Sequence, residues 1–237
     1  MHRDPKAHWR EPATALMYAR TATQIGLWES ERIMVQRYFA LTDELLEVGC
    51  GGGRAGLGML KLGYTGLQLT DFSEAMVSIT RGVLADINPT WAALVAQQDA
   101  TALTYSDASF DGVIYAFNGL MCLPDRDARL AALRSIHRVL RPQGILIFTA
   151  PDREKGKNAA HWKDQTLSAD GIPGNRWHET ETSPVFMHSS TEQETYAELE
   201  RCGFTTVTSP LSTEVALDSK AARDFAGETR FYVARKV

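Results

Sequence analysis

The sequence predicts a single α/β domain in which a mostly parallel, doubly wound sheet is covered by helices on both faces. Two observations favour this class. Short apolar runs of strand length alternate with amphipathic segments between residues 43 and 150. The first of these runs, at residues 45–48, breaks into a cluster of glycines. Strands that alternate with helices form parallel sheets, because each helix carries the chain back across one face of the sheet.

Length and composition fit a globular domain of ordinary type. The chain has 237 residues, of which 44% are hydrophobic and 23% are charged. Its net charge of -4 gives no reason to expect a nucleic-acid partner, since phosphate binding needs clustered Lys and Arg. The three scattered cysteines show neither a disulfide framework nor zinc spacing. We find no signal-peptide pattern and no apolar run of about 18 residues, so we expect a cytoplasmic protein with no membrane partner.

Residues 13–40 are predicted to be helical. Two sets of apolar side chains recur at helical spacing within residues 13–40. Gly26 lies between the two sets and predicts a break or a kink. We therefore expect helices at the N-terminal end, before the first strand.

The alternating region is predicted to hold five strands. Ser73 is a typical helix N-cap, and Glu74 lies in the first helical turn, where the helix dipole favours an acid. Pro142 lies just beyond the end of a strongly amphipathic segment, as expected at a helix end. The predicted strands are 45–48, 66–70, 92–96, 110–117 and 144–150, and the predicted helices are 54–62, the segment after Ser73, and 125–140.

The regular alternation stops after residue 150. Residues 151–190 are rich in Gly, Pro, Thr, Ser and His and have no clear period. A long irregular segment inside a compact domain is usually functional, and we expect a lid. Thr191 and Glu194 have the spacing of a capping box. The remaining predicted elements are a helix at 191–202 and strands at 204–208 and 229–235, which bring the sheet to seven strands.

The end of the first strand has the features of a cofactor site. Residues 45–53 read Leu-Leu-Glu-Val-Gly-Cys-Gly-Gly-Gly. Glycines between a strand and a helix let a ligand approach the backbone, and the helix N-terminus offers free amides. Asp71 and Asp99 end the next two predicted strands, at the edge where open α/β sheets bind ligands. Asp71 is placed to accept both ribose hydroxyls and Asp99 to accept from an adenine amino group, so the pattern suits an adenosine-bearing cofactor.

These segments resemble the motifs of class I S-adenosylmethionine-dependent methyltransferases. Glu47–Gly53 resembles their acidic-x-Gly-x-Gly-x-Gly signature, and Asp71–Met76 resembles the end of their second strand. The likeness covers about residues 40 to 150 and the two terminal strands, and it implies a Rossmann-like sheet with an antiparallel last strand. Further matching segments are Gln98–Ala100, Phe110–Tyr115 and Leu140–Leu146.

The resemblance implies S-adenosyl-L-methionine as cofactor and S-adenosyl-L-homocysteine as product. Glu47 would hold the glycine loop, Asp71 the ribose and Asp99 the adenine edge, while Met76 would pack on adenine. Arg20 either pairs with the cofactor carboxylate or is an ordinary surface residue. The full set of expected cofactor-binding residues is Glu47, Gly49, Cys50, Gly51, Gly53, Asp71, Phe72, Met76, Asp99, Ala100, Ala116, Phe117, Asn118 and Arg20.

We expect one domain over residues 1–237 with four parts. The last part supplies a helix and two strands, and the third helps to bind the substrate. The parts are an N-terminal helical cap (1–40), a cofactor-binding core (41–150), a lid or substrate segment (151–190) and a C-terminal part (191–237).

Methyl transfer from a sulfonium needs mainly alignment, and a base only where the acceptor must lose a proton early. Aromatic side chains in a lid can close over a flat or cationic acceptor. Asn118-Gly119-Leu120-Met121 follows the fourth strand in place of the Asn/Asp-Pro-Pro-Tyr/Phe motif, which favours a small-molecule acceptor methylated on O, N or C. No metal-ligand pattern is present. Candidate bases are His161, His178 and Tyr115, and candidate substrate-binding residues are Tyr18, Trp28, Asn118, Trp162 and Trp177.

Two other functions stay open at this point. Gly51-x-Gly53-x-x-Gly56 also satisfies the dinucleotide fingerprint, with Asp71 near the position of a dehydrogenase ribose acid, so an NAD(P)-dependent oxidoreductase is the main rival. Glu47 at the end of the first strand and the acid at Asp99 argue against that rival. The other alternative is a non-catalytic S-adenosylmethionine-binding protein.

Overall fold

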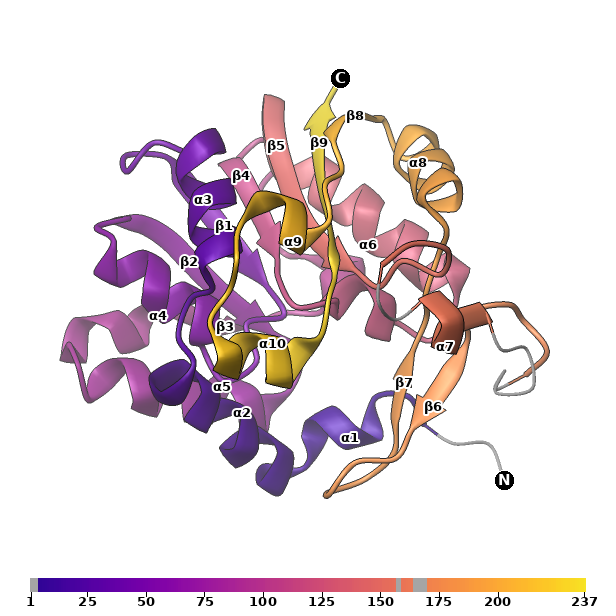
Figure 1. Ribbon diagram of the computed structural model, residues 1–237. Helices are drawn as coiled ribbons and strands as arrows, with labels where there is room; N and C mark the ends of the chain where they lie inside the picture. Colours follow the sequence, from indigo (N-terminus) through magenta and orange to yellow (C-terminus); the bar gives the residue numbers. More distant parts are fainter. Residues whose placement is uncertain (1–3, 157–158, 164–169) are drawn as a thin grey trace.

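A seven-stranded sheet forms the centre of the computed structural model, which describes residues 4–156, 159–163 and 170–237 (Figure 1). The strand order is β3-β2-β1-β4-β5-β9-β8. Strands β1 to β5 pair in parallel, and β9 lies antiparallel between β5 and β8. This confirms the predicted sheet and its antiparallel last strand. The bounds are β1 (Glu44–Val48), β2 (Gly66–Asp71), β3 (Val95–Gln97), β4 (Phe110–Tyr115), β5 (Leu140–Ala150), β8 (Phe204–Thr208) and β9 (Arg230–Lys236).

Helices cover both faces of the sheet (Figure 1). Successive side chains of a strand point to opposite faces, so Leu45 packs in one apolar cluster with Leu57 of α4, while Leu46 packs in the other with Leu133 of α6. All four side chains are at most 1% exposed. The helices are α1 (Ala7–Arg10), α2 (Pro12–Gln24), α3 (Glu29–Tyr38), α4 (Arg54–Lys61), α5 (Glu74–Ala85), α6 (Arg126–Val139), α7 (Ala159–Lys163), α8 (Glu192–Arg201), α9 (Ser212–Val215) and α10 (Lys220–Ala226).

The local signals for helix ends are confirmed. Gly26 lies between α2 and α3 with a φ of +70°, which favours glycine. The Ser73 side chain accepts a hydrogen bond from the Met76 amide at the start of α5. Thr191 and Glu194 form the predicted capping box of α8. Within the described residues, no helix is both long and apolar enough to cross a membrane.

Some predicted boundaries are wrong. Strand β3 covers only Val95–Gln97 rather than 92–96, because Pro89–Leu94 forms a 3-10 helix capped by the Asn88 side chain. Strand β5 begins at Leu140, earlier than predicted, because Leu140 already pairs with Phe110 of β4. The short helices α1, α9 and α10 were not expected from the sequence pattern.

The segment 151–190 has more regular structure than its composition predicts. It contains α7 and a two-stranded sheet of β6 (Arg176–His178) and β7 (Val185–Met187). The turn between these strands contacts the N-terminal helices: the His8 Nδ1 atom lies 2.9 Å from the Ser183 hydroxyl, and the Thr14 and Thr182 hydroxyls lie 3.0 Å apart. Figure 1 shows this hairpin beside α1. The insertion is thus fastened to the N-terminal cap.

The capping box gives a test of local stability. We expect Thr191→Ala to lower the free energy of unfolding by about 1 kcal/mol, because the Glu194 amide loses its side-chain acceptor. Urea denaturation measures the change. Thr191→Ser keeps the hydroxyl and should stay close to the wild type; equal losses in both variants would contradict the capping role.

Candidate cofactor site

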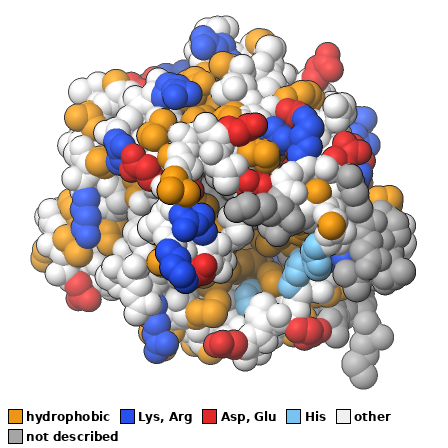
Figure 2. Space-filling view, in the orientation of Figure 1, with side chains coloured by type: hydrophobic (Ala, Val, Ile, Leu, Met, Phe, Trp, Pro, Cys, Tyr) orange, Lys and Arg blue, Asp and Glu red, His pale blue; other side chains and the backbone are white. Residues whose placement is uncertain are grey.

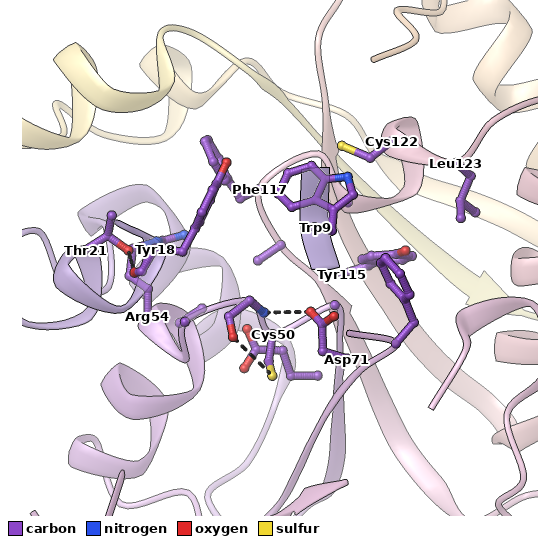
Figure 3. Close-up of a pocket in the computed structure, with 18 of the residues that line it drawn as sticks. Trp9, Tyr18, Thr21, Cys50, Arg54, Asp71, Tyr115, Phe117, Cys122 and Leu123 are labelled. Atoms are coloured by element: carbon purple, nitrogen blue, oxygen red, sulfur yellow. Dashed lines mark hydrogen bonds between the residues drawn. The ribbon is translucent and has the colours of Figure 1, made fainter. Parts of the chain in front are cut away.

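A cavity lies at the carboxyl ends of β1, β2 and β4, and Figure 3 shows it in close-up. Its empty space, part of it open to solvent, is about 860 Å³. Ligands of open α/β sheets bind at this edge, and the volume lies in the range of small-molecule sites. The lining residues are Lys6, Trp9, Tyr18, Thr21, Glu47, Gly49, Cys50, Gly51, Gly52, Arg54, Ala55, Asp71, Phe72, Tyr115, Ala116, Phe117, Gly119, Cys122, Leu123 and Phe225.

Asp71 ties the end of β2 to the glycine loop. Its Oδ2 atom accepts a hydrogen bond from the Gly51 amide at 3.0 Å, and its Oδ1 atom accepts one from the Ser73 amide at 2.9 Å. Figure 3 shows the first of these bonds as a dashed line. Gly51 has a φ of +54°, and a Cβ atom on Gly52 would lie 2.4 Å from the Ala19 backbone nitrogen. The left-handed conformation therefore favours glycine at position 51, and the close backbone requires it at position 52.

The two acids of the cavity are held in an apolar setting. Burial raises the pKa of Asp71 to about 6, against the lowering effect of the amides that it accepts from. Burial also raises the pKa of Glu47 to about 8, while Arg54 favours the ionised form. The Oε2 atom of Glu47 is buried and has no hydrogen-bond partner in the described part of the chain. A buried polar atom of this kind usually has a partner, so a ligand that brings a donor would complete the site.

Arg54 is the buried cation of the cavity. It begins α4, and its guanidinium makes two hydrogen bonds of 2.6 Å to the Glu31 carboxylate. It also stacks on the Trp28 ring, 4.3 Å from the centroid. Arg20, which we expected either to pair with the cofactor carboxylate or to be an ordinary surface residue, is exposed on α2 and does not line the cavity. Arg54 directly follows the glycine motif. That position in the sequence could have indicated that Arg54 lines the cavity.

Asp99 and Lys6 meet at another edge of the cavity. The Asp99 Oδ1 atom accepts a hydrogen bond from the Thr101 amide at 2.9 Å and so caps a short 3-10 helix. Its Oδ2 atom lies 2.7 Å from the Lys6 ammonium, which also lies 5.2 Å from the centre of the Phe72 ring. Both charged side chains are about one third exposed, at 31% and 37%. Asp99 itself does not line the cavity. Its partner Lys6 does.

Aromatic rings from separate parts of the chain line the side opposite Asp71 (Figure 3). The Phe117 and Phe225 rings stack with centroids 4.9 Å apart and planes inclined by 24°. Tyr18 contacts both rings, at 6.3 and 6.0 Å, and Trp9 packs on Tyr18 at 5.5 Å. Figure 2 shows a hollow floored by hydrophobic side chains on this face, beside α10 and α1 in the orientation of Figure 1.

The turn after β4 is strained. Phe117 has a φ of +49° and Asn118 a φ of +61°, which are left-handed values for two consecutive residues that are not glycine. Each such residue costs about 1–3 kcal/mol and is typically held at functional sites. The Asn118 amide donates a hydrogen bond of 3.0 Å to the Thr149 hydroxyl, which fixes the turn. Phe117 is thereby turned out of the line of β4 into the cavity.

The ionisable side chains near the aromatic rings are protonated at neutral pH. Burial raises the pKa of the Cys122 thiol to about 12 and raises the pKa values of Cys50 and Tyr115 well above their usual range. Neither cysteine is therefore an activated nucleophile, because the thiolate is the reactive form. Tyr115 was a candidate base, but its neutral phenol does not accept a proton at this pH.

The structure brings only part of the expected site together. His161, Trp162 and His178 pack against one another in the insertion, with ring centroids 5.4–5.7 Å apart, and Trp177 contacts Phe186. None of these candidates lines the cavity. Trp28 lies behind Phe117 at 5.5 Å and is 3% exposed. The other expected residues that do not line the cavity are Arg20, Gly53, Met76, Asp99, Ala100 and Asn118.

Several lining residues were missed by sequence reasoning. Gly52 and Arg54 belong to the glycine motif, so their positions carried a signal. Trp9 and Phe225 lie more than 200 residues apart in the sequence, and no local pattern connects them. The other missed lining residues are Lys6, Thr21, Ala55, Gly119, Cys122 and Leu123. Among the described residues, no group of His, Cys, Asp and Glu side chains could hold a metal ion.

The fold and the site define an α/β protein with a cofactor cavity at the carboxyl ends of its parallel strands. Residues 45–144 match the family model described as a methyltransferase domain. The protein YqeM of Bacillus subtilis is 31% identical over 106 residues, which cover 44% of this chain and 40% of that protein. The 27-O-demethylrifamycin SV methyltransferase of Amycolatopsis mediterranei is 35% identical over 106 residues, which cover 44% of this chain and 37% of that enzyme.

The whole fold is also found in a solved structure. The CcbJ methyltransferase of Streptomyces caelestis matches with a TM-score of 0.73 at 17% identity, over 99% of this chain and 100% of that one. The aligned region spans about two fifths of the length of the two curated relatives. Residues 45–144 thus match a methyltransferase domain and the fold is shared with that solved methyltransferase, which supports the resemblance to the class I S-adenosylmethionine-dependent methyltransferases. This match favours a methyltransferase over the oxidoreductase alternative, and it supports S-adenosyl-L-methionine as the cofactor.

The raised pKa of Glu47 predicts a pH effect on stability. Because the folded-state pKa of about 8 lies above the usual 4.5, the unfolded chain ionises first, and folding loses stability as pH rises through this window. Glu47→Gln has no carboxyl to ionise, so its free energy of unfolding does not fall with pH for this reason. We expect its stability relative to the wild type to increase by roughly 2–4 kcal/mol between about pH 5 and about pH 8.

Urea denaturation over this pH range checks the prediction. Glu44→Gln is the matched control, since Glu44 lies in the same strand but is exposed. A difference between Glu47→Gln and wild type that stays constant with pH would refute the buried, protonated carboxyl.

Proposed function

We propose that this protein transfers the methyl group of S-adenosyl-L-methionine to a small-molecule acceptor and releases S-adenosyl-L-homocysteine. One observation carries the proposal: a buried carboxylate, Asp71, ends β2 inside the cavity and is bonded to the glycine loop. The cofactor supplies an electrophilic methyl group when bound. The protein's task is then to hold the two reactants in line.

Asp71 has room for a ribose. A carboxylate oxygen offers about two acceptor positions, and each oxygen of Asp71 uses one of them for a backbone amide. One position on each oxygen therefore stays available for a hydroxyl donor, which fits the two adjacent hydroxyls of a ribose. The Gly51 amide fixes the carboxylate, so little reorganisation is needed on binding.

The methionine and adenine parts of the cofactor would also meet complementary side chains. Glu47 and Arg54 line the cavity beside the glycine loop, where a methionine moiety would meet an acid and a cation. Lys6 and Phe72 line the edge near Asp99. An adenine amino group that bonds to Asp99 would replace the Lys6 ammonium there, so we expect Lys6 to move when the cofactor binds.

The acceptor is expected to meet few groups that take up a proton. No histidine lines the cavity in the described part of the chain, and Tyr115 and Cys122 hold their protons. Alignment, rather than a strong protein base, therefore drives the proposed transfer. A small acceptor is supported by the size of the cavity and by the rifamycin named for one relative; the acceptor atom is O, N or C.

The ribose assignment is testable by one substitution. We expect Asp71→Ala to weaken S-adenosylhomocysteine binding by about 1–3 kcal/mol, because the ligand hydroxyls lose their acceptors. Isothermal titration calorimetry measures the change. Asp86→Ala removes an exposed acid at the end of α5 and should leave the affinity at the wild-type value; the same affinity in all three proteins would remove Asp71 from the site.

A further inference from the structure

The aromatic side of the cavity has no unpaired charge to offer. Of the four charged residues that line the cavity, Lys6 pairs with Asp99, Arg54 pairs with Glu31, and Asp71 accepts hydrogen bonds from two amides. The fourth, Glu47, lies at the end of β1 beside the glycine loop. A charged acceptor would therefore lose its hydration at the aromatic side without meeting an opposite charge, which is costly. An anion would gain nothing in return there, and a cation would gain only contacts with ring faces.

The shape of this side favours a flat partner. Phe117 and Phe225 form one stacked pair, and Tyr18 packs against both. Trp9, Cys122 and Leu123 line the same cavity with further apolar surface (Figure 3). Aromatic rings prefer offset-stacked or edge contacts with other rings. A planar ring placed here gains such contacts, whereas an aliphatic chain of similar size gains only burial.

Phe225 is the residue whose position is hardest to explain by packing alone. It lies on the seven-residue helix α10 and remains half-buried, yet its ring contacts are to Phe117 and Tyr18 at the cavity. An aromatic ring left partly open at a cavity wall has surface available for a ligand. Its partner Phe117 is held there by a strained backbone conformation.

We propose that the acceptor is an uncharged, planar aromatic or heteroaromatic molecule that stacks on the Phe117–Phe225 pair, with Trp9 and Tyr18 around it. This inference rests on the proposed methyltransferase function. It makes Phe225 a specificity-determining residue on the acceptor side of the cavity.

Probe binding to the protein saturated with S-adenosylhomocysteine tests the proposal. The probes are 2-naphthol (planar, uncharged), cyclohexanol (aliphatic), tetramethylammonium (cationic) and 2-naphthalenesulfonate (anionic), and calorimetry gives each affinity. We expect 2-naphthol to bind about tenfold or more tighter than each of the others. Equal or tighter binding of cyclohexanol, tetramethylammonium or the sulfonate would overturn the proposal.

A substitution links the preference to the residue. We expect Phe225→Leu to weaken 2-naphthol binding by about tenfold and to leave S-adenosylhomocysteine binding within about twofold. Phe186→Leu is the matched control, because Phe186 packs on Trp177 outside the cavity. Trp9→Leu should also weaken 2-naphthol. Unchanged 2-naphthol affinity in both Phe225→Leu and Trp9→Leu would refute the acceptor site.

The titration also separates the two proposals. If S-adenosylhomocysteine fails to bind the wild-type protein, the proposed function fails first. If it binds and 2-naphthol shows no preference, only the acceptor class is wrong.

Discussion

The hydrogen bond from the Gly51 amide to the Asp71 carboxylate is the contact on which the site depends. It joins the end of β2 to the loop after β1, two segments that the parallel pairing of these strands brings to the same edge. The loop can adopt this path because Gly51 takes a left-handed conformation and Gly52 packs against the backbone of α2. Under the proposed function, the carboxylate that holds the loop also accepts hydrogen bonds from the ligand. One interaction thus sets both the shape of the cavity and its chemistry.

The cavity has two sides of different origin. The polar side comes from strand ends of the central sheet, which is rigid because its apolar faces are buried between helices. The aromatic side comes from α1, α2, α10 and the strained turn after β4, which lie far apart in the sequence. Under the proposed function, the sheet edge binds the cofactor, and the segments outside it select the acceptor.

The sequence predicted the polar side better than the aromatic side for a physical reason. The glycine loop, Asp71 and the N-cap Ser73 act through contacts within a few residues or between neighbouring strands, so short motifs carry the information. The partner of Asp99 is Lys6, 93 residues away, and the partner of Phe117 is Phe225. Such contacts depend on how the terminal segments fold back over the sheet, which periodicity does not encode.

The insertion shows the same limit. Its aromatic pairs predicted a lid over the acceptor; Trp162 and His178 pack together and do not line the cavity, and the hairpin contacts the N-terminal helices. The described part of the insertion contacts the N-terminal helices at His8 and Thr14. These helices in turn supply lining residues of the cavity. The role of residues 151–190 in binding the substrate remains a proposal; residues 157–158 and 164–169 lie outside the described part of the chain.

The most direct measurement is a pair of calorimetric titrations of the wild-type protein, one with S-adenosylhomocysteine and one with NADH. A nucleoside cavity built on Asp71 and the glycine loop of a methyltransferase predicts saturable, about micromolar binding of S-adenosylhomocysteine and no binding of NADH. Binding of NADH without binding of S-adenosylhomocysteine would contradict the assignment of the cavity.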